Sequence, residues 1–358
     1  MTDLLPQLGR PTLVEFRNQV EGSLAQFVQE KKAAWIETPL TPVLDAIERL
    51  VLDGGKRIRP AMCHAGYLIG GGSDEAALVP AAASLEMWHS FALIHDDIMD
   101  DSTTRRGART VHCGLADLHQ LTGWRGDSDR FGVAAGIIAR DLCYAWSDEL
   151  YAASRLPAYR LSAGREVLAT MRAETVAGQY LDLHGQAAGA SVEEALVMIA
   201  LKAGRYTVER PLQLGVVLAG GDPAMLNLCE NIGGPLGEAF QLRDDLLGAF
   251  GDPTKTGKST VEDLRNGKST VLVACARETA SVSQLRQLNE LLGNPDLDGA
   301  GVATVRGVLE DTGARQRVEA MIEQREAAVA VALNGSPLSG ERRDVIEELI
   351  QRCTDRDA

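Results

Sequence analysis

The sequence predicts an all-helical protein built as one domain. Apolar residues recur at helical spacing, and little of the chain alternates apolar and polar residues as a strand does. The 358 residues are 45% hydrophobic but only 4% aromatic, and alanine, leucine and glycine are abundant. No linker rich in proline and serine interrupts residues 1–358, so a single domain is expected, although the length would permit two or three.

Glycine and proline separate the expected helices. These helices span residues 12–35, 42–52, 60–70, 75–101, 131–153, 158–187 and 224–249. A capping box from Ser191 to Glu194 opens a further helix, which Pro211 should kink because proline removes a hydrogen bond and clashes with the preceding turn. Residues 121–130 are the most loop-like stretch of the first half, and four or so amphipathic helices follow residue 270.

Charge and cysteine content narrow the functional classes. The 36 basic and 50 acidic residues give a net charge of −14, which argues against binding to nucleic acid or to anionic membranes. The six cysteines are scattered with no C-x-x-C pair, so free thiols in a reducing compartment are expected. Neither a signal peptide nor a run of about 18 apolar residues is visible. A soluble cytoplasmic protein without a transmembrane segment is therefore expected.

The helix expected over 75–101 ends in a cluster of carboxylates. Asp96 and Asp100 are four residues apart and share one helix face, and Asp97 and Asp101 stand beside them. Carboxylates at this spacing repel one another unless a positive charge lies between them, and Mg²⁺ completes its octahedron with water and phosphate oxygens. The pattern indicates a Mg²⁺–phosphate site, although a solvated acidic helix end would show the same residues.

A second acidic helix end and several basic residues support the first interpretation. Asp244 and Asp245 close another apolar stretch, and Lys258 and Lys268 follow in a glycine-rich loop. Cations also gather elsewhere: Lys56, Arg57 and Arg59 lie between Gly54-Gly55 and Pro60, and Arg105 and Arg106 fall in an expected loop. Arginine forks match phosphate oxygens, and a helix start also presents N–H groups to anions. An ordinary basic loop remains the alternative for residues 56–59.

The order of these motifs resembles that of the trans-isoprenyl diphosphate synthases, or polyprenyl synthetases. The matching segments, which span roughly residues 40–275, are Gly54-Gly-Lys-Arg-Ile-Arg-Pro60, Asp96-Asp-Ile-Met-Asp100, Arg105-Arg-Gly107, Gly178-Gln-Tyr-Leu-Asp182, Lys202, Phe240-Gln-Leu-Arg-Asp-Asp245, Gly257-Lys258 and Gly267-Lys268-Ser-Thr270. The resemblance implies the all-α isoprenoid synthase bundle, with ten or more helices around a deep central cavity. It also implies a homodimer, and it leaves the helices of residues 270–355 as scaffold.

The resemblance also implies a role for each matching residue. Asp96, Asp97, Asp100, Asp244 and Asp245 would hold Mg²⁺, with three ions in each active site. The allylic diphosphate would be bound by Arg105, Lys202, Gln241, Lys258 and Lys268, and isopentenyl diphosphate by Lys56, Arg59, His89 and Arg106. Asp96, Asp97, Asp100, Asp244 and Lys202 would serve catalysis. His89 alone would otherwise be interpreted as a core histidine.

Two positions depart from the family pattern. Many relatives have Gly-Asp where this chain has Arg140-Asp141, and the arginine could either alter close helix packing or point to solvent. Most relatives place a third aspartate at the position of Gly248.

Product length is expected to depend on the helix before Asp96. Ala92, Phe91 and Trp88 lie four, five and eight residues before Asp96. Both aromatic residues could instead be ordinary core residues. An aromatic residue at the fifth position before Asp96, with none at the fourth, is a pattern that resembles the geranylgeranyl diphosphate synthases. This resemblance implies a twenty-carbon product. Farnesyl diphosphate is the alternative because Trp88 could raise the floor of the cavity.

Two other functional classes share parts of this pattern. A class I terpene cyclase has the first aspartate motif but needs no isopentenyl diphosphate site, and it usually carries a different second metal motif. A non-catalytic partner subunit generally loses aspartates from one motif, whereas both motifs begin intact here.

Overall fold

The protein is a helical bundle, as predicted. The computed structural model describes residues 12–251 and 262–354. Within these ranges the chain is helical apart from one two-stranded hairpin. The first half comprises α1 (Leu13–Ala34), α2 (Thr41–Leu52), α3 (Ile58–Ile69), α4 (Glu75–Met99), β1 (Thr104–Arg105), β2 (Ala108–Arg109), α5 (Val111–Thr122) and α6 (Ser128–Ala152).

The second half begins with the longest described helix, α7 (Ala158–Ala188). It continues through α8 (Val192–Ile199), the π-helix η1 (Ala200–Glu209), α9 (Arg210–Ala219), α10 (Pro223–Phe250), α12 (Glu262–Arg265), α13 (Val271–Thr279), α14 (Val282–Leu291), α15 (Gly299–Asp311), α16 (Ala314–Asn334) and α17 (Glu341–Thr354). The expected boundaries of most helices are therefore close to the observed ones.

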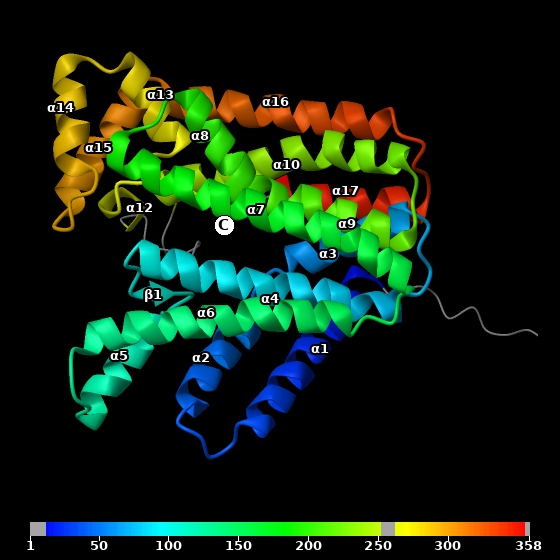
Figure 1. The fold of residues 1–358 in the computed structure, drawn as a ribbon. Helices are drawn as coiled ribbons and strands as arrows, with labels where there is room; N and C mark the ends of the chain where they lie inside the picture. Colours follow the sequence, from blue (N-terminus) through cyan, green and yellow to red (C-terminus); the bar gives the residue numbers. More distant parts are fainter. Residues whose placement is uncertain (1–11, 252–261, 355–358) are drawn as a thin grey trace, which may run out of the picture.

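The long helices form two stacked groups (Figure 1). In one group α4 and α6 pack along each other, with α1, α2 and α5 beneath them. In the other group α7, η1, α10 and α16 lie side by side. The C-terminal end of α4 and the β1–β2 hairpin lie at the end of the bundle that also carries α12 and α15.

The stretch predicted to be most loop-like is shorter than expected. Helix α5 extends to Thr122 and ends at Gly123, whose φ of 65° is left-handed. Helix α6 begins three residues earlier than predicted, because the Asp127 carboxylate accepts a hydrogen bond from the Arg130 N–H at 2.7 Å and caps the helix. The expected Ser191 capping box is present, with Glu194 as its partner.

The distortion predicted at Pro211 takes the form of a π-helix. The ten residues Ala200–Glu209 are wound more widely than an α-helix and lead directly into α9, whose first turn contains the proline. Pro211 cannot donate a hydrogen bond to the carbonyl four residues earlier, and its ring crowds that carbonyl. A wider turn relieves both problems, and such turns often occur at functional sites.

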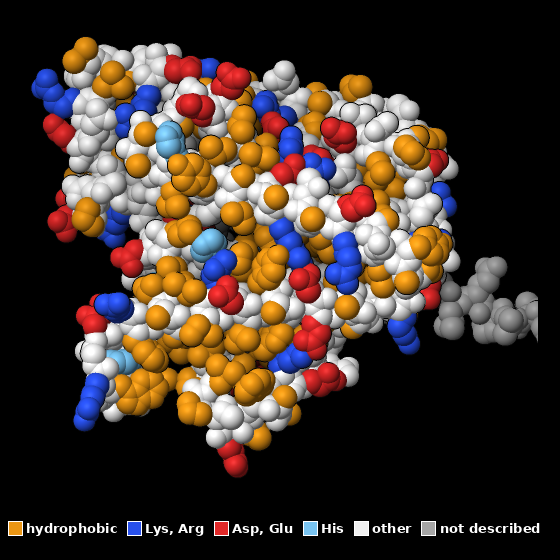
Figure 2. Space-filling model, viewed as in Figure 1, with side chains coloured by type: hydrophobic (Ala, Val, Ile, Leu, Met, Phe, Trp, Pro, Cys, Tyr) orange, Lys and Arg blue, Asp and Glu red, His pale blue; other side chains and the backbone are white. Residues whose placement is uncertain are grey.

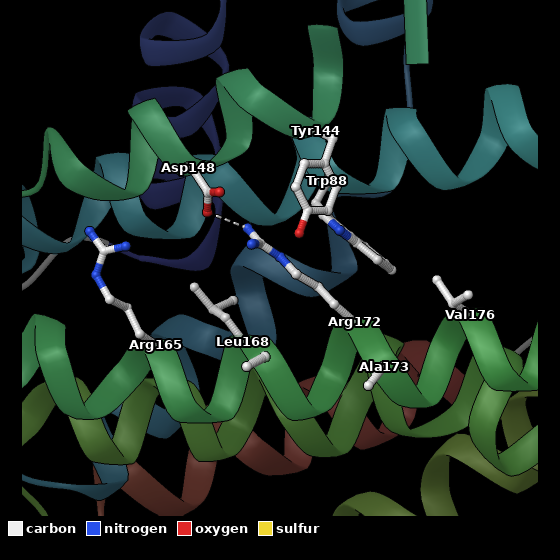
Figure 3. A pocket seen from close by; sticks show the side chains of 9 residues that line it. Trp88, Tyr144, Asp148, Arg165, Leu168, Arg172, Ala173 and Val176 are labelled. Atoms are coloured by element: carbon white, nitrogen blue, oxygen red, sulfur yellow. Dashed lines mark hydrogen bonds and ion pairs between the residues drawn. The ribbon is translucent and has the colours of Figure 1, made fainter. Parts of the chain in front are cut away.

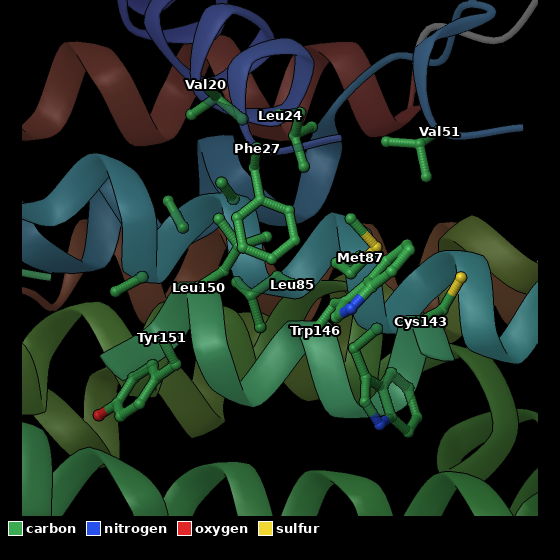
Figure 4. Close-up of a cluster of buried hydrophobic side chains, with 14 of the residues drawn as sticks. Val20, Leu24, Phe27, Val51, Leu85, Met87, Cys143, Trp146, Leu150 and Tyr151 are labelled. Carbon is green, nitrogen blue, oxygen red and sulfur yellow. The ribbon is translucent and has the colours of Figure 1, made fainter. Parts of the chain in front are cut away.

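The largest hydrophobic core joins α1, α4 and α6 (Figure 4). Phe27 of α1 meets Trp146 of α6 edge to face, with ring centroids 6.1 Å apart, and Leu85 and Met87 of α4 are almost fully buried beside them. This packing anchors α4, whose far end carries the carboxylates. The α4–α6–α1 core therefore holds the acidic helix end in a fixed position.

Burial also explains the apolar composition of α4. In the described part of the chain, α4 is the one helix long and apolar enough to cross a membrane, with a mean hydropathy of 1.3 in its most apolar window. However, 78% of that window is buried inside the protein. The helix therefore has the character of a core helix.

Candidate active site

Three carboxylates from two distant helices meet at one point. Oxygens of Asp96 and Asp100 on α4 and of Asp182 on α7 all lie within 4.8 Å of one another. Asp182 belongs to a motif recognised in the sequence, but it was not predicted to be a metal ligand. All the donor atoms are carboxylate oxygens, which are the ligands that Mg²⁺ prefers. In the described residues the group does not extend to Asp244 or Asp245.

The carboxylates at the end of α4 are too buried to be a solvated acidic terminus. Asp97 is 1% exposed and Asp100 is 8% exposed. Oδ2 of Asp97 and Oδ1 of Asp100 have no hydrogen-bond donor among the described residues. Burial raises the pKa of both groups, and the charge of Asp96 raises that of Asp100 further. Buried, mutually repelling oxygens with unused lone pairs fit a bound cation.

Lys202 connects the two helices that supply these carboxylates. Its Nζ donates to Oδ1 of Asp96 at 2.8 Å and also to Oδ2 of Asp182. Burial opposes ionisation of Asp96, but the charges of Lys202 and Lys268 outweigh it and hold the pKa of Asp96 below its usual range. The close approach of α7 to η1 depends on Gly178, because a Cβ at this position would lie 2.3 Å from the backbone nitrogen of Lys202. Gly178 therefore lets α7 and η1 come close enough to share this lysine.

Two further cations reach the same carboxylates. Lys268 lies 3.2 Å from Oδ2 of Asp100. Arg105 donates from Nε to Oδ1 of Asp97 at 2.7 Å and contacts Asp96 at 3.4 Å. Although burial opposes it, the charge of Asp97 raises the pKa of Arg105. Three of the four cations predicted for this diphosphate, Lys202, Lys268 and Arg105, thus lie around the acidic end of α4.

Arg105 and Arg106 lie in a hairpin and not in an irregular loop. Arg105 is the last residue of β1, and Arg106 and Gly107 form the two-residue turn, with φ values of 54° and 78°. Positive φ at both central positions is the signature of a type I′ turn, which matches the twist of paired strands. The two arginine side chains therefore contact different groups. Arg105 donates to Asp97, whereas Arg106 donates to the carbonyls of Asp53 and Gly54 at 3.3 and 3.2 Å.

A second group of cations lies further along α4, around His89, which precedes Asp96 by seven residues. Arg59 donates to the Tyr206 hydroxyl and, at 2.9 Å, to the Thr207 hydroxyl, and its guanidinium lies 4.1 Å from the centre of the Tyr206 ring. The Tyr206 hydroxyl is in turn 2.7 Å from Nδ1 of His89. His89 is half-buried. Burial, followed by the charges of Arg59, Arg106 and Arg105, lowers its pKa well below 6.5.

Arg57 does not belong to this group, contrary to the interpretation of residues 56–59 as one cradle. Its side chain is buried, donates to Glu86 at 3.0 Å and donates to the Val51 carbonyl at 2.7 Å. Its φ of 50° turns it away from its neighbours. Lys56 is exposed and Arg59 is half-buried. The alternation of exposed and buried cations was not readable from the sequence.

The second acidic helix end lies on α10. Asp244 and Asp245 are half-buried, and Gln241 donates to Oδ1 of Asp245 at 2.8 Å. Helix α10 approaches η1 closely, since a Cβ on Gly237 would lie 2.5 Å from the Gly204 carbonyl oxygen. Lys258 lies outside the described residues.

Tyr206 and Asp182 are the two site residues that the sequence analysis did not assign. Tyr206 follows Lys202 by four residues, and both side chains reach α4 from η1. That spacing on one helix face is a readable signal once Lys202 is identified. Asp182 could have been found from its place in the Gly178–Asp182 motif.

A pocket of 540 Å³ lies between α4, α6 and α7 (Figure 3). Its lining comprises Trp88, Tyr144, Asp148, Arg165, Leu168, Ala169, Arg172, Ala173 and Val176. Phe91 is buried directly behind this lining, with its ring 5.4 Å from both Trp88 and Tyr144. The Arg140 guanidinium lies 4.5 Å from the centre of the Phe91 ring, so Arg140 stacks on this aromatic group and is only half-buried.

An all-helical bundle with an acidic helix end enclosed by lysine and arginine side chains has the architecture of the isoprenoid synthases. The family model described as Polyprenyl synthetase matches residues 41–308. The chain therefore belongs to the polyprenyl synthetase family, whose members are Mg²⁺-dependent prenyltransferases.

Individual relatives agree on the family and differ in their products. The chain is 34% identical over 278 residues to a geranylfarnesyl diphosphate synthase from Aeropyrum pernix, which covers 75% of this chain and 80% of that protein. It is 30% identical over 304 residues to a farnesyl diphosphate synthase from Geobacillus stearothermophilus, covering 79% and 96%. A crystal structure of geranylgeranyl pyrophosphate synthase from Corynebacterium glutamicum, complexed with isoprenyl diphosphate and magnesium, has a TM-score of 0.92 at 36% identity and covers 97% and 100%. The chain is a prenyl diphosphate synthase whose product length these comparisons leave open.

Proposed function

We propose that the protein condenses isopentenyl diphosphate with allylic diphosphates and produces the all-trans, twenty-carbon geranylgeranyl diphosphate. The main support is the presence of two different cation-rich regions at two levels along α4. One surrounds the carboxylates of Asp96 and Asp100, and the other surrounds His89. A reaction that joins two diphosphates requires two such regions.

The allylic diphosphate is assigned to the carboxylate region. Asp96, Asp97 and Asp100 on α4, with Asp244 and Asp245 on α10, would hold three Mg²⁺ ions. When bound, these ions would neutralise the charge that develops on the departing pyrophosphate. The cations assigned to the same diphosphate are Arg105, Lys202 and Lys268, together with Lys258, and Gln241 is assigned as a polar ligand.

Isopentenyl diphosphate is assigned to the second region. Arg59 and Arg106 supply guanidinium forks, and Lys56 supplies a further positive charge. His89 is neutral at pH 7 because its pKa is lowered, so it would serve as a hydrogen-bonding group and not as a charge. Tyr206 orients both Arg59 and His89 through its hydroxyl.

The reaction has three bond changes. The allylic C–O bond breaks and the pyrophosphate leaves with the electron pair, while Lys202 and Arg105 stabilise the charge on its oxygens. The double bond of isopentenyl diphosphate forms the new carbon–carbon bond with the allylic carbon. A proton is then lost from the adjacent carbon to the released pyrophosphate. Apolar side chains of the pocket exclude water from the cationic carbon.

Product length is assigned to the residues before Asp96. Phe91 is buried against Trp88 and Tyr144, and Ala92 is half-buried beside it. Phe91→Ala should extend the product beyond twenty carbons, and Ala92→Phe should shorten it to fifteen. Chromatography of the dephosphorylated products measures both. An unchanged distribution for Phe91→Ala would make Phe91 a core residue, and a fifteen-carbon product of the unaltered enzyme would favour farnesyl diphosphate.

A single incubation tests the proposed reaction against its alternatives. Isopentenyl diphosphate, an allylic diphosphate and Mg²⁺ should yield a longer linear chain. A cyclic hydrocarbon would indicate a terpene cyclase, and a complete lack of turnover would indicate a non-catalytic partner subunit. The cation group around Arg59 favours the synthase, because a cyclase has no second diphosphate to bind.

A homodimer is the proposed assembly. Large apolar side chains are exposed along α6. In Figure 2, hydrophobic side chains gather on the part of the surface where Figure 1 shows α5 and α6. They are Phe131, Val133, Ile137, Ile138 and Tyr144. An exposed apolar patch of this kind is typical of a protein–protein interface. Light scattering of the purified protein would measure the mass. The six free cysteines fit the reducing cytoplasm that we propose as its location.

A further inference from the structure

The π-helix η1 carries side chains that belong to both cation-rich regions. Lys202 reaches Asp96, and Tyr206, four residues later, reaches His89. The winding of the helix between them decides how the two side chains are separated around its axis. A contact that stabilises this winding therefore positions both side chains together.

One carboxylate of α7 binds two arginines of this segment. Glu174 accepts hydrogen bonds at 2.7 Å from Nη1 of Arg205 and from both Nε and Nη2 of Arg210. Burial opposes ionisation of Glu174, but the hydrogen bonds and charges of the two arginines outweigh it and hold its pKa below the ordinary value. Glu174 is therefore ionised at neutral pH and binds both guanidinium groups.

Both arginines can reach one carboxylate because of the π-helical winding. Arg205 and Arg210 are five residues apart, and the Arg210 N–H donates to the Arg205 carbonyl, which is the i→i+5 hydrogen bond of a π-helix. Residues joined by this bond lie about one turn apart on the same side of the helix. In an α-helix, with about 3.6 residues per turn, the two side chains would point about 140° apart. The double contact of Glu174 thus favours the wide winding over an α-helical one.

Glu174 also fixes η1 relative to α7. It shares a face of α7 with Gly178, four residues later, where the backbone of Lys202 comes closest to α7. Both arginines also contact Glu209, but Glu209 is itself the last residue of η1 and moves with it. Among the described residues, Glu174 is the one carboxylate of another helix that contacts both arginines.

We infer that Glu174 is a positioning residue, which stabilises the π-winding of η1 and thereby places Lys202 and Tyr206 in their two regions at once. The inference rests on the proposed assignment of these regions to the two diphosphates. Without Glu174, η1 can rewind toward an α-helix, and this turns Tyr206 relative to Lys202. The use of both substrates should therefore depend on one carboxylate whose partners in the described part of the chain are Arg205 and Arg210.

Glu174→Gln keeps the size of the side chain and removes its charge and one acceptor oxygen. The value of kcat should fall by roughly tenfold to a hundredfold, because a displacement of about 1 Å in a reacting group can cost about a hundredfold. KM for isopentenyl diphosphate should rise by roughly threefold to tenfold, which corresponds to about one hydrogen bond. Steady-state kinetics with each substrate varied in turn measure both constants.

The matched control is Glu48→Gln. The Glu48 side chain is 22% exposed, against 17% for Glu174, and it accepts hydrogen bonds from Lys32 and Gln29 across the contact of α2 with α1. Its loss should lower the urea midpoint as much as Glu174→Gln does, but kcat and both KM values should not change. If folded Glu174→Gln likewise keeps its kinetic constants, Glu174 is a structural residue and the inference is wrong. A change in only one of the two constants also contradicts it, since the winding would then not serve both regions.

A second variant keeps the inference testable if Glu174→Gln does not fold. Arg205 is 40% exposed, and Arg205→Met leaves Arg210 to pair with Glu174, so this protein should fold. Its kcat and its KM for isopentenyl diphosphate should change in the same directions by smaller factors. Unchanged constants in Arg205→Met would contradict the inference.

A double variant tests the winding itself. Pro211 independently opposes α-helical winding, because it cannot donate to the carbonyl four residues earlier. Pro211→Ala alone should leave kcat within about threefold, a small change in barrier, since Glu174 still stabilises the winding. Combined with Glu174→Gln, it should lower kcat by more than the product of the two single losses, and a simple product would contradict the inference. These outcomes differ from failure of the proposed function, in which the unaltered enzyme would join no diphosphates at all.

Discussion

The two cation-rich regions beside α4 differ in how their charges are balanced. At the end of α4, Lys202, Arg105 and Lys268 all contact aspartates of the site. Around His89, Arg59 contacts the hydroxyls of Tyr206 and Thr207, and Arg106 contacts backbone carbonyls. The carboxylate of Glu86, which could have neutralised this second region, is bound by Arg57 instead.

This difference indicates two ways to bind a diphosphate. In the carboxylate region the positive side chains are already neutralised, so a diphosphate would need the additional charge of metal ions. In the second region, Arg59 and Arg106 donate hydrogen bonds to neutral hydroxyls and carbonyls of the described residues, and their guanidinium groups can bind an anion directly. Burial is the main cause of the lowered pKa of His89, and the charges of Arg59 and Arg106 lower it further. Substitutions should therefore affect Mg²⁺ dependence in the carboxylate region and not in the region around His89.

The largest effect is expected from the carboxylates. Asp96→Asn, Asp100→Asn and Asp244→Asn should each lower kcat by roughly a thousandfold or more, since metal-assisted stabilisation of the leaving group contributes several kcal/mol. The matched control is Asp101→Asn, because Asp101 is exposed and has a φ of 48° that asparagine adopts readily. Steady-state kinetics at saturating Mg²⁺ measure this. A near-normal rate for Asp96→Asn would contradict the assignment of Asp96 as a Mg²⁺ ligand.

The same substitutions should act differently on stability. Burial and the charge of Asp96 raise the pKa of Asp100, so its ionised form is unfavourable in the folded protein without metal. In the presence of EDTA, Asp100→Asn should therefore unfold at a denaturant concentration equal to or higher than that of the unaltered protein. A clear loss of stability would show that Asp100 is a structural residue.

The second largest effect is expected at the buried Arg57–Glu86 pair. Both side chains are 4% exposed, so Glu86→Gln leaves the buried Arg57 guanidinium with only the partly exposed Glu21 carboxylate, 3.6 Å away, and should lower the free energy of unfolding by about 3 kcal/mol. The control is Glu278→Gln, which breaks the exposed pair with Arg317 and should cost less than about 1 kcal/mol. Urea denaturation measures both. A raised KM for isopentenyl diphosphate in a fully stable Arg57→Met protein would instead indicate that Arg57 helps to bind this diphosphate.

A smaller effect, confined to one substrate, is expected from Arg59. Charge-assisted hydrogen bonds contribute roughly 1.5–3 kcal/mol, so Arg59→Met should raise KM for isopentenyl diphosphate by roughly tenfold to a hundredfold. KM for the allylic diphosphate and the dependence on Mg²⁺ should not change. Arg109→Met is the control, because Arg109 is an exposed hairpin arginine that pairs with Asp117. An equal rise in both KM values would contradict the assignment of separate regions.

The sequence predicted the parts of this site that depend on local spacing. Asp96 and Asp100 share a face because they are four residues apart on one helix, whereas the hairpin at Arg105–Arg106 was expected only as a loop. Contacts between distant segments were not readable. Asp182 of α7 meets Asp96 of α4, and Lys202 can bridge them because Gly178 lets the backbones of α7 and η1 approach each other.

The burial of the Arg57 side chain is another contact between distant segments that was not readable from the sequence. It stands between Lys56 and Arg59 in a basic motif, and its residue type gives no sign that Glu86 will bury it. The side chain's direction is decided by a left-handed backbone conformation and by the packing of α4 against the 54–57 segment. Likewise, the stacking of Arg140 on Phe91 depends on how α4 and α6 pack, so the sequence left its environment open.

The smallest effect is expected from Gly248 on α10. Most relatives have an aspartate at this position, whereas the acidic end of α10 consists here of Asp244 and Asp245, with Asp245 hydrogen-bonded to Gln241. We expect Asp244 to supply the metal contact, so Gly248→Asp should change the Mg²⁺ concentration for half-maximal activity by less than about threefold, or well under 1 kcal/mol. Gly248→Asn is the matched control, because it adds a side chain of the same size without a charge. A drop of tenfold or more for the aspartate and not for the asparagine would show that this chain lacks a ligand that its metal site can use, and that the α10 end is the weaker of its two carboxylate clusters.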